Sequence, residues 1–170
     1  MVSQDIVLFR GSLADNLAYS APHASREAIA EVARLAQLDS LIASHVLPPI
    51  NVVFIDSLDH PRRAKELPPN PFFADFMAHE LLPWLRQQGL DAIRQKTVVA
   101  GSSYGGLAAS WVALRYPRLF ANVLSLSGSY WWAPAGEAPG WMQRAWQTLP
   151  SPLPNVRFYI DAGSFEGGRG

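Results

Sequence analysis

A Gly-Ser-Ser-Tyr-Gly turn at residues 101–105 constrains the fold of this chain more than any other stretch. The residues before it, 98–100, are apolar and indicate a buried strand, whereas residues 106–115 are mostly small and apolar and indicate a helix. The glycines that flank Ser103 indicate a turn too tight for neighbouring side chains, with unusual backbone angles. The sequence therefore predicts a serine presented at the end of a strand, on a sharp turn into a helix.

A serine in this position is suited to nucleophilic catalysis. The order strand, Gly-x-Ser-x-Gly, helix is the nucleophile elbow of α/β-hydrolases, so we predict that Ser103 is the nucleophile. The helix that follows directs its N-terminal amides and the positive end of its dipole toward the same point. An oxyanion would lie there, held in part by the backbone N–H of Tyr104.

Strands and helices alternate along the chain after residue 47. The patterns predict strands at 52–55, 97–100, 122–127 and 156–160, and helices at 72–87, 106–115 and 141–148. Pro83 is expected to kink the first of these helices. Alternation of this kind predicts an α/β fold, with a mostly parallel sheet and helices on both faces. Active sites in such sheets lie at the carboxyl ends of the strands, where Ser103 is expected.

Composition excludes several classes of function. Lys and Arg number 14, Asp and Glu also number 14, and the formal net charge is zero, so nothing predicts a nucleic-acid partner. The absence of cysteine excludes a disulfide framework, a Cys nucleophile and thiolate metal sites. The N-terminus lacks a signal-peptide pattern, and no apolar stretch approaches the roughly 20 residues of a membrane span. We expect a cytoplasmic protein without membrane contact, and no metal or cofactor.

Residues 1–46 differ in character from the rest and predict a loop, a short helical turn and an amphipathic helix with Ser25 as a candidate N-cap. The segments at residues 2–9, 11–19 and 24–29 resemble the Q-loop region of ABC-transporter ATPases. In that family the glutamine that matches Gln4 senses Mg²⁺ and the γ-phosphate. The chain contains no Gly-x-x-x-x-Gly-Lys-Ser/Thr loop to hold phosphates. We therefore expect no ATP site.

Residues 47–170 resemble a different family, the enterochelin (enterobactin) esterases. The matching positions are Asn70 and the segments 47–49, 53–59, 63–67, 80–83, 97–107 and 123–132. The resemblance implies a partial α/β-hydrolase domain over 47–170, with an ABC-ATPase-like fragment at 1–46. It also implies hydrolysis of the serine ester bonds of a trilactone catecholate siderophore, which releases iron inside the cell.

The nucleophile needs a base, which a carboxylate orients, and in α/β-hydrolases these partners follow in the order Ser, Asp or Glu, then His. A strand at 156–160 leads into an acidic loop. The resemblance implies that Glu166 orients the histidine, and Asp161 is the alternative. Either carboxylate is equally explained as an ordinary solvated loop residue.

The histidine itself is not found after the elbow. His23, His45, His60 and His79 all precede Ser103, and the resemblance implies a histidine in a loop beyond Gly170. His60 follows a strand and is the only one we expect to approach the site, although a loop histidine without a catalytic task explains it as well. Loss of a triad base costs about 10⁴–10⁶ in rate, so we expect an impaired esterase.

The resemblance also implies substrate contacts. Arg63 matches an arginine near the site, where it would hold a catecholate oxygen or stabilise a loop at the sheet end. Tyr130, Trp131 and Trp132 follow a strand at the catalytic edge, where they would stack on catechol rings or pack in the core.

Three classes of function stay open from sequence: an esterase, a non-catalytic remnant or fusion fragment that binds a catecholate or nothing, and, least favoured, an ABC-transporter ATP-binding piece. A hydrolase sheet without its early and late strands would also leave apolar edges unpaired, which favours aggregation.

Overall fold

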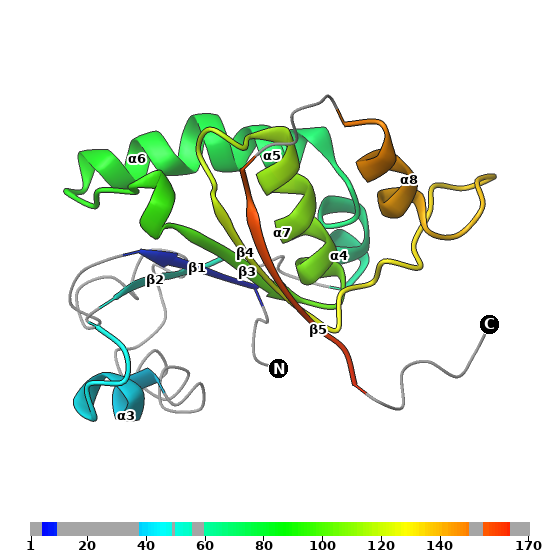
Figure 1. The fold of residues 1–170 in the computed structure, drawn as a ribbon. Coiled ribbons are helices and arrows are strands. Elements are labelled where there is room, and N and C mark those ends of the chain that lie inside the picture. The colour runs from blue at the N-terminus through cyan, green and yellow to red at the C-terminus, as the bar shows by residue number, and fades with distance from the viewer. Residues whose placement is uncertain (1–4, 10–37, 49, 56–59, 150–154, 164–170) are drawn as a thin grey trace.

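The computed structural model describes residues 5–9, 38–48, 50–55, 60–149 and 155–163 (Figure 1). In chain order the elements are β1 Asp5–Phe9, α3 Leu38–Ala43, β2 Asn51–Phe54, α4 His60–Glu66, α5 Pro71–Phe76, the π-helical turn η1 Met77–Leu81, α6 Leu82–Gln87, the 3₁₀ turn η2 Arg94–Lys96, β3 Val98–Ser102, α7 Tyr104–Arg115, β4 Asn122–Leu126, α8 Trp141–Gln147 and β5 Arg157–Asp161. Among the described helices, none has the length and apolar character needed to cross a lipid bilayer.

The five strands form one sheet in the order β2-β1-β3-β4-β5. β3, β4 and β5 are parallel, with Ser102 beside Leu126 and Leu126 beside Asp161. β1 pairs antiparallel with both β2 and β3, so it alone runs against the other four strands. The predicted α/β fold with a mostly parallel sheet is confirmed, and the carboxyl ends of β3, β4 and β5 meet at one edge.

β1 departs from the sequence prediction, which treated residues 2–9 as part of a loop. The structure places Asp5–Phe9 inside the sheet, where Val7 pairs with Val53 of β2 and with Val99 of β3. The sheet thus takes one strand from before position 46/47 and four strands from after it. The division into two domains at this position stays a prediction. Most of the amphipathic helix predicted after Ser25 lies outside the described residues, apart from the last turns in α3.

One long helix, formed by α5, η1 and α6, lies with α7 on one face of the sheet (Figure 1). It begins at Asn70, whose side chain accepts a hydrogen bond of 2.9 Å from the backbone N–H of Phe72, and Pro71 occupies the first turn. The predicted irregularity at Pro83 takes the form of the wider π turn just before it, in which Leu82 N–H donates to Met77 O. Since proline has no N–H to continue the α pattern, the wider turn accommodates it.

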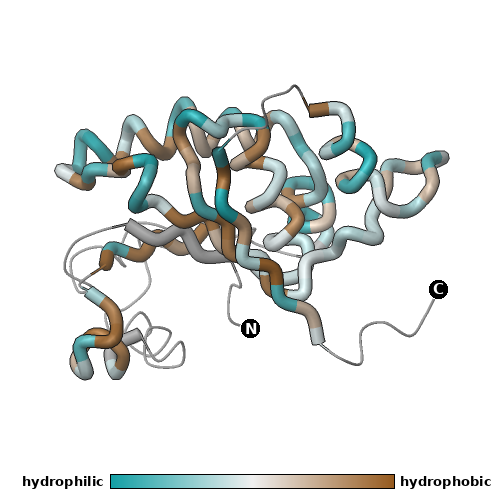
Figure 2. The backbone as a smooth tube through the Cα atoms, in the orientation of Figure 1, coloured by the Kyte–Doolittle hydropathy of each residue, from teal (hydrophilic) through white to brown (hydrophobic). Residues whose placement is uncertain are grey.

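The core lies between this helical layer and the sheet. Figure 2 shows apolar residues concentrated in the strands and in the helix turns that face them. The buried core residues are Val53, Ala74, Met77, Leu81, Leu82, Leu85, Leu90, Val99, Ala109, Val112, Ala113, Phe120 and Val123. α7 therefore packs on β3 and β4 along its length and holds the turn at Ser103 against the sheet.

Candidate functional site

The turn at Ser103 has the backbone of a strained elbow. β3 ends at Ser102, and α7 begins at Tyr104, two residues earlier than predicted. Ser103 between them has φ 57° and ψ −120°, in a region that non-glycine residues seldom occupy. Such strain persists only where the surrounding structure enforces it, and it is concentrated at functional sites. The Ser103 side chain is exposed at the carboxyl edge of the sheet.

Glycines fit this turn because other atoms pass very close to their Cα atoms, the backbone of Gly105 in the case of Gly101. A Cβ atom built on Gly101 would lie 2.4 Å from the carbonyl carbon of Gly105, and one on Gly106 would lie 2.5 Å from Ser125 Oγ. The predicted lack of space beside the serine is therefore confirmed. The unusual backbone angles, in contrast, fall on Ser103 itself.

The end of β4 and the residues after it fix the elbow from the next strand. Ser103 N–H donates to Leu126 O (3.0 Å), and Ser129 N–H donates to Ser103 O (3.0 Å). The hydroxyl oxygens of Ser103 and Ser129 are 3.1 Å apart, and Ser129 is 3% exposed. Ser129 lies in the segment 123–132 that carries the esterase resemblance, but it was not predicted as a site residue. The available signal was its position just after the strand next to the elbow strand, at the same sheet edge.

Tyr104, the predicted oxyanion donor, lies at the N-terminus of α7, and its role stays a prediction. Tyr104 is the first helical residue, so its N–H has no carbonyl of its own helix to donate to. The positive end of the helix dipole lies at the same place. The site can therefore stabilise negative charge next to Ser103.

Arg63 reaches the same edge from α4. Its Nη2 donates to the carbonyl oxygen of Ser102, at 3.1 Å. Of the two roles expected for Arg63, this contact is the one that stabilises the sheet end, because it holds the last residue of β3. A role in substrate binding stays a prediction.

The three aromatic residues after β4 lie in different surroundings. The Tyr130 hydroxyl lies 2.7 Å from Ser110 Oγ, and its ring is 5.5 Å from that of Trp146. The Trp132 ring packs 6.2 Å from that of Trp141. Trp131 is 65% exposed, and its ring centroid is 6.1 Å from that of Tyr104, beside the elbow. Trp131 is therefore the one of the three that presents its ring to solvent next to Ser103.

Of the two candidate acids, the structure describes Asp161. It ends β5, and its backbone oxygen accepts a hydrogen bond of 2.8 Å from Ser127 N–H. It lies two strands from Ser102, or about 10 Å at the usual strand spacing. Its side chain is exposed. Glu166 lies outside the described residues, and the role of either carboxylate stays a prediction.

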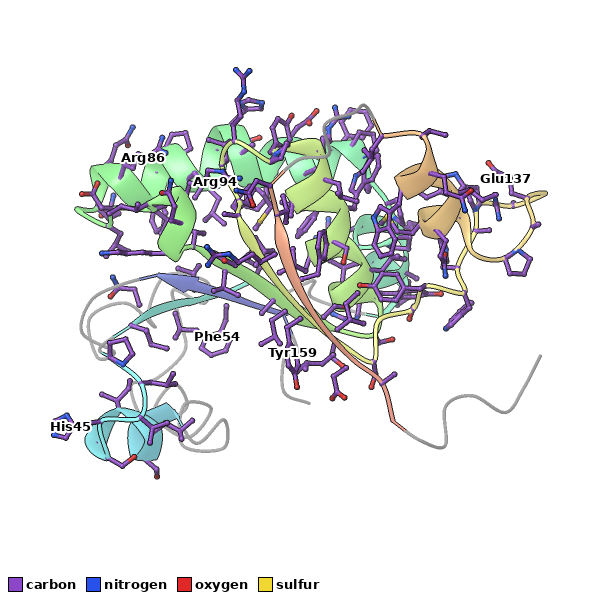
Figure 3. The ribbon with its side chains drawn as sticks, viewed as in Figure 1. His45, Phe54, Arg86, Arg94, Glu137 and Tyr159 are labelled. Atoms are coloured by element: carbon purple, nitrogen blue, oxygen red, sulfur yellow. The ribbon has the colours of Figure 1, made fainter. Side chains whose placement is uncertain are left out.

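Neither described histidine side chain lies at the elbow. His79 Nε2 is 3.1 Å from the hydroxyl of Tyr116, which follows the C-terminus of α7. Because α7 has 12 residues, this contact lies about 18 Å from the elbow at the N-terminus of the helix. Figure 3 shows His45 at α3, away from the parallel strands. His60 is the first residue of α4, although its side chain, like all of His23, lies outside the described part of the chain.

The far end of α7 is an ionic cluster. Arg115 Nε donates to Asp75 at 2.9 Å, and the Tyr116 hydroxyl donates to the same carboxylate oxygen. These hydrogen bonds lower the pKa of Asp75, and the one from Arg115 has the larger effect. The hydrogen bond to Asp75 in turn raises the pKa of Tyr116. The cluster ties α5 to the C-terminus of α7 and is structural.

Comparison with known proteins agrees with this geometry. A family model described as putative esterase matches residues 27–168. The iron(III) enterobactin esterase of Escherichia coli O6:H1 is 39% identical over 128 residues, which cover 74% of this chain and 32% of the relative. The iron(III) salmochelin esterase of the same strain is 32% identical over 142 residues, covering 78% and 35%.

Solved structures extend the likeness to the fold. The enterobactin esterase FES from Shigella flexneri, determined in the presence of enterobactin, superposes with a TM-score of 0.62 and 37% identity, covering 71% of this chain and 31% of that one. The chain thus spans about a third of the length of these relatives. None of these proteins is an ABC-transporter ATPase, so they lend no support to the Q-loop resemblance of residues 1–46.

Proposed function

Since this chain belongs to the putative esterase family, we propose that it is a serine esterase acting on the ester bonds of a catecholate siderophore of the enterobactin type. The observation that carries the proposal is the Ser103 elbow: a strained, exposed serine between β3 and the N-terminus of α7. The substrate class comes from relatives that are named for enterobactin and salmochelin.

In the proposed reaction Ser103 Oγ attacks the ester carbonyl carbon, and the carbonyl oxygen takes the negative charge. The Tyr104 N–H and the positive end of α7 stabilise that charge. Collapse of the intermediate expels the alcohol, which leaves with a proton. Water then releases the acyl group from Ser103 and restores the enzyme. The iron belongs to the substrate and takes no part in these steps.

The proton of Ser103 needs an acceptor, because a serine hydroxyl is a weak nucleophile. The Ser129 hydroxyl, 3.1 Å away, can orient Ser103 Oγ but is not basic enough to take its proton. His60 is the candidate base within the chain, since α4 also carries Arg63, which contacts the end of β3.

We assign recognition of a catechol ring to Trp131, which is exposed and lies against Tyr104. An aromatic face of this kind binds planar rings by stacking. The rings of Tyr130 and Trp132 pack instead against those of Trp146 and Trp141.

The experiment compares the chain with Ser103→Ala and with Ser44→Ala, a matched control at an exposed position beyond α3. Hydrolysis of the catecholate triserine trilactone and of a chromogenic acyl ester is followed with increasing imidazole, which can act as an external base. We expect turnover that rises with imidazole in the chain and in Ser44→Ala, and only the background rate in Ser103→Ala. Equal rates in all three proteins would contradict the proposal.

A second arm asks whether the chain carries its own base. If turnover occurs without imidazole, its pH profile should rise near the ordinary histidine pKa of about 6.5. That rise should disappear in His60→Ala and return when imidazole is added. A profile unchanged in His60→Ala would exclude His60 as the base, while leaving Ser103 as the nucleophile.

The exposed Trp131 also supports a second candidate function, binding of a catecholate without turnover. In that case a ferric catecholate should quench tryptophan fluorescence equally in the chain and in Ser103→Ala, and hydrolysis should stay at background even with imidazole.

A further inference from the structure

β5 forms an open edge of the sheet. It pairs with β4 on one side, and among the described residues no strand pairs with its other side. All five of its residues are exposed, including Tyr159 (63%) and Ile160 (47%). Figure 2 shows its apolar stretch flanked by hydrophilic residues. An edge with these properties is suited to pairing with another strand.

The direction of the backbone groups decides which residues can make that pairing. Arg157 N–H donates to Ala121 O, and Asp161 O accepts from Ser127 N–H, so both residues direct their main chain toward the β4 side. Because this direction alternates along a strand, Phe158 and Ile160 direct their N–H and C=O groups outward. The open edge therefore offers two donors and two acceptors.

The sequence of β5 is Arg-Phe-Tyr-Ile-Asp, so its charges are complementary when two copies of the strand pair antiparallel. In an antiparallel pair centred on Tyr159, Arg157 lies opposite Asp161 of the other strand, and Phe158 lies opposite Ile160. The same register makes Phe158 and Ile160 hydrogen-bonded pairs, as their outward main chains require. A parallel pair in register would instead place like charges side by side, which is unfavourable.

We propose that β5 is a self-association surface, which pairs antiparallel with β5 of a second copy of this chain about a two-fold axis normal to the sheet. Four backbone hydrogen bonds join Phe158 and Ile160 of the two copies. Two Arg157–Asp161 ion pairs flank the Tyr159 rings. The result is one continuous ten-stranded sheet with both helical layers on the same face.

The side chains of the paired β5 strands lie on two faces of the sheet, one toward the helices and one away from them. Phe158 lies beside Val123, which faces the helices, and its ring is 5.9 Å from that of Trp146 in α8. Tyr159 lies on the opposite face, as Figure 3 shows, together with Arg157 and Asp161. Neither charged side chain has an ion-pair partner among the described residues, so each is available to the second copy.

The test exchanges the charges. Arg157→Asp and Asp161→Arg each set like charges opposite one another twice in a homodimer, and each should weaken the dimer by about tenfold or more. The double variant, and equally a mixture of the two single variants, restores both ion pairs. Sedimentation over a concentration series measures the dimer fraction. Arg86→Asp, on the exposed side of α6, is the charge-matched control, and circular dichroism checks that each variant is folded.

We expect a dimer for the chain, the double variant, the mixture and Arg86→Asp, and mainly monomer for each single variant. Three results would overturn the proposal: a chain that stays monomeric, a dimer indifferent to both single variants, or single variants that fail to recombine when mixed. A monomeric chain would indicate that the edge pairs with another strand of a longer polypeptide. A dimer indifferent to both single variants would place the dimer contact elsewhere. None of these results depends on esterase activity.

Discussion

The tight contact under the elbow makes Gly101→Ala an informative substitution. The added Cβ would lie 2.4 Å from the carbonyl carbon of Gly105, 2.5 Å from its oxygen and 2.8 Å from its Cα. The first of these distances is about 1 Å short of ordinary van der Waals contact. All three atoms are backbone, so no side chain can move aside. The start of α7 must shift away from β3.

The expected cost follows from that shift. Overpacking of a buried site costs about 1–3 kcal/mol, which for a chain of this size lowers Tm by about 3–10 °C. A displacement of about 1 Å at a reacting group costs about 10²-fold in rate. We therefore expect Gly101→Ala to lower both Tm and the Ser103-dependent turnover measured in the presence of imidazole.

Gly89→Ala is the control. Gly89 follows α6 with φ 81°, and nothing lies within 4 Å of a Cβ built there. Its cost is the left-handed backbone alone, about 1–2 kcal/mol, with no effect at the elbow. Circular dichroism melts and ester hydrolysis measure both proteins. If Gly101→Ala kept its Tm within about 1 °C and its full turnover, the close approach of β3 and α7 could not be what fixes the serine.

Two further predictions concern Trp131 and Asp75. Trp131→Ala should weaken catecholate binding by about fivefold, as measured by the quenching of tryptophan fluorescence. Trp132→Ala should weaken binding less, because Trp132 packs on Trp141. Equal affinities in the chain and Trp131→Ala would exclude the stacking role. Because its hydrogen-bonded neighbours lower the pKa of Asp75 in the folded state, its stabilisation is present above the unfolded pKa and is lost as pH falls through the folded one. Urea melts below about pH 4 should therefore show a smaller further loss of stability in Asp75→Asn than in the chain, and parallel pH curves would contradict this.

Local patterns were sufficient to predict the elbow. The apolar strand, the glycine spacing and the small helix residues lie within about 20 consecutive residues, and their geometry depends on contacts among themselves, such as that of Gly101 with Gly105. The alternation of β3, α7, β4, α8 and β5 was also predicted, with ends displaced by one or two residues.

Contacts between distant residues could not be predicted in this way. Residues 5–9 are a short apolar run, which alone does not distinguish a strand from other buried chain, and the two strands that pair with it come much later in the sequence. The contact between the hydroxyls of Ser103 and Ser129 depends on the turn at Ser127, whose φ of 47° no sequence pattern indicated. The surroundings of Tyr130, Trp131 and Trp132 likewise depend on α7 and α8.

The position of β1 has a consequence for the order of folding. During synthesis β1 can pair first only with β2, and an isolated two-stranded ladder is marginally stable in water. Its second neighbour, β3, ends at the residue before Ser103 and must close a long loop to reach it. Pairings this distant in sequence form slowly. The nascent chain should therefore gain a stable sheet and a positioned serine in one late step, when β3 docks beside β1 and α7 closes over both.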